Sequence, residues 1–155
     1  MTKIYTDGAC IPNPGTGAWG VVIVDGENIE TYSGKVNDTT NMRTEIQAAI
    51  KGLSRSTSLE VEVISDSKIV LDAFLKRWIY SWVNDNWVGR LNADLWKRLL
   101  EYSRAKEITW TWVKGHSGDK YNEMADKLAD NLLIDVPGRK EFESKMAYFN
   151  NLKKR

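Results

Sequence analysis

The chain has 155 residues, of which 42% are hydrophobic and 28% are charged, a composition that is typical of one globular domain and excludes a disordered chain. Its apolar runs span only a few residues, so we expect no membrane-spanning helix and no membrane partner. The 22 basic and 21 acidic residues give a net charge of +1, which alone argues against a strongly charged partner.

The first third of the chain is predicted to form three strands joined by turns. Residues 3–7 are rich in β-formers, residues 13–17 have turn chemistry, and residues 18–24 form a β-branched run that ends at an Asp-Gly hairpin signal. A third strand is expected over residues 29–33. Strands joined by turns this short pair antiparallel.

The middle of the chain is predicted to alternate helices with strands, because its hydrophobic spacing switches between the two periods. The helices are expected over residues 42–53, 69–74, 77–82, 95–100 and 121–132, and the strands over residues 59–64 and 107–113. Strands that alternate with helices lie parallel to a neighbour. The sequence therefore predicts an α/β fold with a mixed five-stranded sheet, three antiparallel strands followed by two parallel ones, and helices on both faces.

Residues 136–155 form a separate basic segment. They carry six basic and two acidic side chains, a net charge of +4, so the rest of the chain carries −3. Phe142, Met146 and Phe149 have helical spacing. We therefore expect a domain over residues 1–135 and a basic C-terminal extension. Two interpretations of the extension are open: it packs its apolar stripe on the domain, or it binds phosphates.

The location is predicted from the cysteine content and the first residues. Cys10 is the only cysteine, which excludes an internal disulfide and agrees with a reducing compartment. Met1 is followed at once by a strand-like segment without the features of a signal peptide. We therefore expect a cytoplasmic protein.

Four acidic residues stand at unusual positions. Asp7 lies inside a predicted strand, where Asp is depleted, and Asp66 lies at a strand-to-helix turn. Glu45 and Asp126 adjoin the apolar stripes of helices. Because ligand sites in open α/β sheets collect beyond strand ends, the four carboxylates can converge. The alternatives are that Asp66 caps a helix and that Glu45 and Asp126 are solvated.

Converging carboxylates would need cations between them, because their mutual repulsion raises their pKa values and destabilises the fold. Oxygen ligands favour hard cations such as Mg²⁺ or Mn²⁺. Two such ions about 4 Å apart can activate a water and stabilise the leaving oxygen of a phosphodiester. The acidic residues therefore predict a nuclease with two Mg²⁺ ions, with Mn²⁺ as the alternative.

Six short motifs occur in order between residues 3 and 133. They are residues 5–10, 13–15, 39–45, 65–67, 110–116 and 122–129. Together they resemble the ribonuclease H family, type 1, whose members hydrolyse the RNA strand of RNA–DNA hybrids. The resemblance implies the ribonuclease H-like fold, a catalytic domain over residues 1–135, an RNA–DNA hybrid as partner, and products with 3′-hydroxyl and 5′-phosphate ends. A monomer is the default expectation.

The resemblance also assigns catalytic residues. Asp7, Glu45, Asp66 and Asp126 look like the family's metal-binding carboxylates. His116, the only histidine, lies on a glycine-flanked loop, and the resemblance implies a role in proton transfer or product release. A solvent-exposed loop histidine is the alternative.

Substrate recognition is expected to divide between the RNA and DNA strands of the hybrid. Gly8, Cys10, Asn13 and Asn41 look like positions that touch the RNA minor groove and its 2′-hydroxyls, which distinguish RNA from DNA. Thr40 resembles the residue that, with Asn13, holds a phosphate of the DNA strand. Cys10 is expected to act through packing and backbone contacts, not as a nucleophile.

The tryptophan cluster that includes Trp78 and Trp82 resembles the family's handle, a helix-loop protrusion that lies on the DNA strand. Of Trp78 and Trp82, one is expected to stack on deoxyribose and the other to pack inward; core packing of both is the alternative. The handle departs from the family because Arg90 is its one basic residue between positions 81 and 92. Lys68, expected to bind substrate, stands where glutamine is common, and Asp38 where an arginine often binds phosphate. Hybrid binding by the handle should be weak, and the basic extension is a candidate to compensate.

Two other functions are compatible with this fold. A DNA-directed nuclease on the same fold would not need the minor-groove positions Cys10, Asn13 and Asn41. A non-catalytic hybrid-binding module would gain nothing from four clustered carboxylates near phosphates.

Overall fold

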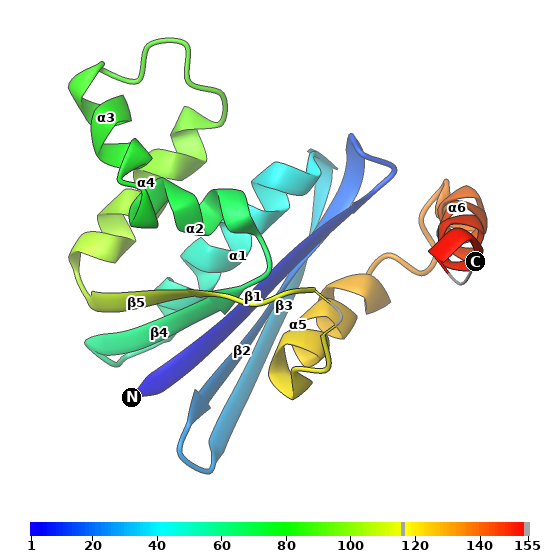
Figure 1. Ribbon diagram of the computed structural model, residues 1–155, viewed down its shortest axis with the longest axis horizontal. Helices are drawn as coiled ribbons and strands as arrows, with labels where there is room; N and C mark the ends of the chain where they lie inside the picture. The colour runs from blue at the N-terminus through cyan, green and yellow to red at the C-terminus, as the bar shows by residue number, and fades with distance from the viewer. Residues whose placement is uncertain (116, 154–155) are drawn as a thin grey trace.

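The computed structural model describes residues 1–115 and 117–153 of the protein (Figure 1). Its elements form one sheet with helices packed against it. In chain order they are β1 (Thr2–Ile11), β2 (Gly15–Asp25), β3 (Asn28–Thr39), α1 (Asn41–Arg55), β4 (Glu60–Ser65), α2 (Lys68–Leu75), α3 (Trp78–Asn84), α4 (Ala93–Arg104), β5 (Glu107–Trp112), α5 (Lys120–Asn131) and α6 (Arg139–Lys153).

The sheet has the strand order β3-β2-β1-β4-β5. β1 pairs antiparallel with β2, and β2 pairs antiparallel with β3. On the other side of β1, β4 is parallel to β1 and β5 is parallel to β4. The predicted mixed five-stranded sheet is confirmed, and β1 is its central strand.

The first and third strands are longer than predicted. β1 continues past residue 7 to Ile11, and β3 continues past residue 33 to Thr39. The reason is pairing along the whole of β2, which matches Ile11 with Thr16 and Gly15 with Thr39. This tertiary pairing outweighs the local preference of residues 37–39 for turns and caps.

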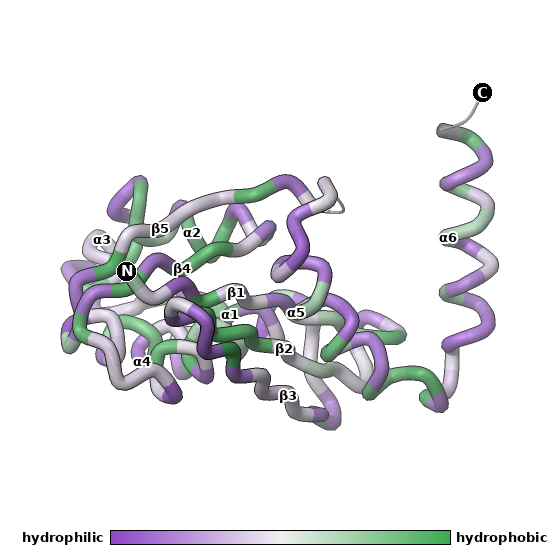
Figure 2. Tube along the Cα trace, turned by 90° about the horizontal axis from the view of Figure 1, so that it is seen from below, coloured by the Kyte–Doolittle hydropathy of each residue, from purple (hydrophilic) through white to green (hydrophobic). Residues whose placement is uncertain are grey.

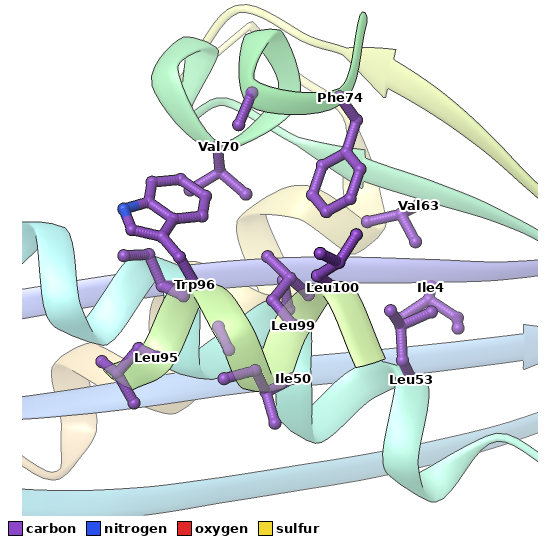
Figure 3. Close-up of a cluster of buried hydrophobic side chains, with 14 of the residues drawn as sticks. Ile4, Ile50, Leu53, Val63, Val70, Phe74, Leu95, Trp96, Leu99 and Leu100 are labelled. Carbon is purple, nitrogen blue, oxygen red and sulfur yellow. The ribbon is translucent and has the colours of Figure 1, made fainter. Parts of the chain in front are cut away.

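Alternate residues of β1 face opposite layers of the molecule. Ile4 packs in the main core with Ile50 and Leu53 of α1 and Leu99 of α4, as Figure 3 shows. Tyr5 belongs to a second cluster, on the other face of the sheet, with Ala125 of α5. Helices therefore cover both faces of the sheet, as predicted. The central residues of β1 lie between the two helical layers.

The helix predicted in the basic extension is confirmed as α6, but its apolar stripe does not pack on the domain. Phe142, Met146 and Phe149 are 37%, 41% and 55% exposed. In Figure 2 the helix stands away from the body of the molecule. The interpretation that α6 covers the domain with this stripe is therefore wrong. Within the described part of the chain, no helix is both long and apolar enough to cross a membrane.

Candidate active site

Three of the four singled-out carboxylates meet at one edge of the sheet. Ligand oxygens of Asp7, Glu45 and Asp66 all lie within 4.8 Å of one another. Asp66 directly follows the end of β4, and Thr6 of β1 is paired with Ser65 of β4. Since the two strands are parallel, the next residue of each reaches the same edge. The N-cap of α2 is Ser67, so Asp66 is not the helix cap.

Glu45 reaches the cluster because α1 lies very close to β1 at Gly8. A Cβ atom at Gly8 would lie 2.6 Å from the carbonyl carbon of Thr44. The Gly8 N–H group points at both acids, at 2.9 Å from Asp7 Oδ1 and 2.6 Å from Glu45 Oε1. Glu45 is only 7% exposed, so it is not a solvated helix acid. Gly8 therefore places and holds two of the three carboxylates.

Asp126 joins the cluster from the opposite layer. Gly20 is the register partner of Asp7, and a Cβ atom at Gly20 would collide with the carbonyl oxygen of Ala125. The missing side chain lets α5 approach the strand and brings Asp126 to the same hollow, of about 540 Å³, that Asp7 lines. The close trio does not include Asp126, but a hydrogen bond links it to Asp7 and helps to raise the pKa of Asp7.

The electrostatics of the cluster favour a bound cation. Burial, then the charges of Glu45 and Asp66, raise the pKa of Asp7 to about 11. Burial also raises the pKa of Glu45 to about 7, although hydrogen bonds from Asp7, Gly8 and Ser67 act in the opposite direction. Burial penalises the ionised form of both groups, and a bound cation would offset that penalty. An all-oxygen donor set of this kind fits a hard divalent ion.

The predicted minor-groove residues lie beside this cluster. Asn41 and Gly8 line the same hollow as the carboxylates. The Asn13 Oδ1 atom accepts a hydrogen bond of 3.0 Å from the Asn41 N–H, which ties the β1–β2 turn to the start of α1. Thr40 is the N-cap of α1, and its hydroxyl accepts from the Arg43 N–H. Asn13, Thr40 and Asn41 thus share one surface.

Cys10 and Lys68 have different environments. The Cys10 thiol is buried and donates to the carbonyl oxygens of Pro12 and Thr39. Burial raises the pKa of Cys10, which makes it a poor nucleophile, in keeping with the packing role expected from the sequence. Lys68 is exposed and lines the hollow of the carboxylates. Its ammonium group can therefore contact a phosphate at the site.

The two handle tryptophans have different surroundings. Trp78 is 39% exposed, with the Lys76 ammonium 5.5 Å from its ring centroid. Trp82 packs between Trp87 and Trp96, with ring centroids 6.3 and 5.1 Å away, and Arg90 lies 4.2 Å above it. Trp78 is therefore available to a ligand, whereas Trp82 supports the fold of the handle.

His116 lies outside the described residues. The residue before it, Gly115, approaches the cluster so closely that a Cβ atom there would lie 2.8 Å from Asp66 Oδ2. The Trp112 indole N–H donates to the Asp66 carbonyl oxygen at 3.1 Å. Sequence reasoning missed these two neighbours of Asp66. The parallel register of β4 and β5, which pairs Ser65 with Trp112, is the signal that could have found them.

Comparisons with known proteins agree with this geometry. A family model described as RNase H matches residues 1–133. A protein named "Ribonuclease H" from Zymomonas mobilis is 44% identical over 140 residues, which cover 86% of this chain and 89% of the relative. Another of that name from Syntrophus aciditrophicus is 41% identical over 151 residues, covering 94% of this chain and 85% of the relative.

A solved structure shares the fold. It is the crystal structure of LC9-RNase H1, described as a type 1 RNase H with the type 2 active-site motif. The two chains are 25% identical with a TM-score of 0.74, and the match covers 84% of this chain and 70% of that one.

Proposed function

We propose that this chain, which belongs to the ribonuclease H family and is a ribonuclease H enzyme, hydrolyses the RNA strand of RNA–DNA hybrids. One of the solved structures that it resembles is a type 1 member of the family. The proposed products have 3′-hydroxyl and 5′-phosphate ends, and the proposed cofactor is a pair of Mg²⁺ ions, with Mn²⁺ as the alternative. The observation that carries the proposal is the close trio of Asp7, Glu45 and Asp66, of which Asp7 and Glu45 are buried.

The carboxylates are the proposed metal ligands and catalytic residues. Asp7 is central, because it contacts the other acids and is itself 6% exposed. Glu45 and Asp66 complete the trio, and Asp126 contributes from α5. Divalent ions held there would activate a water and stabilise the leaving oxygen. The Gly8 N–H bonds keep Asp7 and Glu45 in one geometry, which limits the reorganisation needed during reaction.

The substrate is proposed to lie across β1 and the start of α1. Gly8, Cys10, Asn13 and Asn41 would face the RNA minor groove, where the 2′-hydroxyl distinguishes RNA from DNA. Thr40 would hold a phosphate of the DNA strand together with Asn13. These assignments are supported by Gly8 and Asn41 in the hollow of the carboxylates, by Cys10 in the adjoining hollow, and by Asn13 and Thr40 at the start of α1.

Three further residues have proposed roles. Lys68 would contact a phosphate near the cluster, and Trp78 would stack on the DNA strand. His116 would assist proton transfer or product release. For Trp82 we propose only support of the handle, since its ring packs against two other tryptophans.

The chain organisation is part of the proposal. The matched family region ends at residue 133, which supports a catalytic domain over residues 1–135 and a separate basic extension over residues 136–155. A monomeric state and a cytoplasmic location stay predictions from the sequence.

Parallel cleavage assays test the function against its rivals. End-labelled RNA–DNA hybrid, duplex RNA and duplex DNA of one sequence are incubated with the full chain and Mg²⁺ or Mn²⁺. We expect cleavage of the RNA strand of the hybrid alone. Preferential cleavage of duplex DNA would favour a DNA-directed nuclease, and hybrid binding without cleavage under any metal would favour a binding module.

A further inference from the structure

A second hollow lies beside the carboxylate cluster, between the domain and α6. Its volume is about 530 Å³. Residues 8–11 and Asn41 line it from the domain, and Phe142 and Met146 line it from α6. Gly8, Asn41 and Asp126 line both this hollow and that of the cluster, so the two are continuous. We term this second hollow the α6 groove.

The base of α6 is fixed to the domain. The Arg139 guanidinium donates to both oxygens of Asp130 in α5, at 2.7 and 3.2 Å, and to Glu143 one turn along α6 at 2.8 Å. Just before the helix, Val136 is buried in a cluster that includes Ile11 of β1. The position of α6 over the groove is therefore set by contacts with α5 and β1.

Beyond this base, the side chains of α6 that face the groove are partly exposed to solvent. Phe142 and Met146 line the groove yet remain 37% and 41% exposed. A 15-residue helix is marginally stable in water by itself, and an amphipathic helix normally buries its apolar stripe. A ligand in the groove would cover Phe142 and Met146, the two residues of the stripe that line it.

We propose that α6 is a substrate-binding element and that the α6 groove receives the RNA strand next to the scissile phosphate. This inference rests on the proposed function. The groove opens at Asp126 and is lined opposite α6 by Gly8, Cys10 and Asn41, the proposed minor-groove residues. Aromatic and apolar side chains contact nucleotides by stacking on sugars and bases.

The net positive charge of the basic extension favours nucleic acid as the occupant, although the charged residues that line the groove itself are three acids and one base, Asp126, Asp130, Glu143 and Arg139. The helix over residues 139–153 carries four basic and two acidic residues, and residues 154 and 155 add two more basic ones. The domain carries −3 and includes the acidic cluster. A basic element at the rim of an acidic catalytic site attracts phosphates where the domain itself does not. The α6 helix thereby supplies affinity that the weakly basic handle lacks.

The first test compares two faces of the same helix. Phe142→Ala with Met146→Ala removes the groove face, and Tyr148→Ala with Leu152→Ala is the matched control, because these residues are 62% and 44% exposed and do not line the groove. We expect the groove pair to raise KM for the hybrid about ten-fold, a loss typical of one stacking contact, and the control to change it less than two-fold. Equal effects of both pairs, or no effect of the first, would overturn the inference.

The second test identifies the occupant directly. A photoreactive phenylalanine replaces Met146 in the full chain, which is irradiated with a hybrid whose two strands carry different labels. We expect a crosslink to the RNA strand. A crosslink only to the DNA strand, a crosslink to a second copy of the chain, or none at all would overturn the inference.

The two proposals fail in different ways. If the wild-type chain does not cleave hybrids, the proposed function fails and the inference fails with it. If the wild-type chain cleaves hybrids but Met146 gives no RNA crosslink and the groove pair keeps its KM, only the role of α6 fails.

Discussion

The carboxylate cluster and α6 border two adjoining hollows but are held in opposite ways. Asp7 and Glu45 are buried and fixed by the backbone of Gly8, with three elements meeting at one point. The α6 helix is joined to the domain at its base, and its apolar side chains face solvent. The proposed catalytic residues thus lie where the structure is rigid and electrostatically strained, and the proposed additional affinity for substrate lies where a ligand is needed to order the side chains.

The largest effect should come from the centre of the rigid region. Asp7→Asn keeps the size of the side chain but removes the charge that would bind cations. We expect kcat for hybrid cleavage to fall about a thousand-fold or more, measured with Mg²⁺ at saturating substrate. Unchanged circular dichroism is the control for folding. Activity within ten-fold of wild type would refute the assignment of Asp7.

The strain in the cluster should appear as a pH-dependent stability. A carboxyl group whose pKa is raised in the folded protein binds its proton more tightly there, so stability falls as pH rises from the unfolded value near 4 through the folded one. For Glu45, whose pKa is raised to about 7, this window is about pH 4 to 7, and for Asp7 it extends through neutral pH to about 11.

Asp7→Asn should therefore stabilise the metal-free protein. At pH 8 in chelator we expect its free energy of unfolding to exceed that of wild type by about 2–4 kcal/mol, with a smaller difference at pH 4. Urea unfolding at both pH values measures this. Equal stability of the two proteins at pH 8 would mean that the cluster is not strained.

The close approach of α5 gives the next prediction. Gly20→Ala introduces a Cβ atom against the Ala125 carbonyl and should push Asp126 away from Asp7. We expect a loss of about 1–3 kcal/mol in stability and about a ten-fold or greater loss in kcat.

The matched control for Gly20 is Gly26→Ala. Gly26 has a positive φ of 62° and no neighbour within 4 Å of a built Cβ atom. This variant should lose about 1 kcal/mol through backbone strain and keep its activity. A similar loss of kcat in both variants would show that instability, not the position of Asp126, is responsible.

The smallest effect should come from the base of α6. Arg139→Ala removes partly exposed ion pairs with Asp130 and Glu143, so the free energy of unfolding should fall by only about 1 kcal/mol or less. The freed helix should also bind the hybrid more weakly. A loss of several kcal/mol in the free energy of unfolding would contradict the contrast between α6 and the carboxylate cluster, because α6 would then be held as firmly as the cluster.

Much of this architecture could be predicted from local patterns. The period-two alternation of residues 59–64 and 107–113 and the helical spacing of residues 121–132 correspond to β4, β5 and α5. These segments have strong apolar patterning, which the tertiary structure reinforces. Asp7 also stood out, because a strand gives an aspartate little structural use.

What the sequence could not provide depends on contacts between distant residues. Gly8 and Gly20 position Glu45 and Asp126 by close approaches that leave no local signal. The inward direction of Trp82 is set by its packing against Trp96 in α4. The helical spacing in α6 predicted a helix correctly, but spacing alone does not tell whether the apolar stripe meets the domain or a ligand.

The central claim, that the acidic cluster is a divalent metal site, is tested most directly by thermal unfolding with increasing Mg²⁺ at pH 8. A cation that binds only the folded state raises the Tm in proportion to the logarithm of its concentration above its Kd. We predict such a rise for wild type and none for Asp7→Asn. No rise for wild type, or an equal rise for both proteins, would contradict the account.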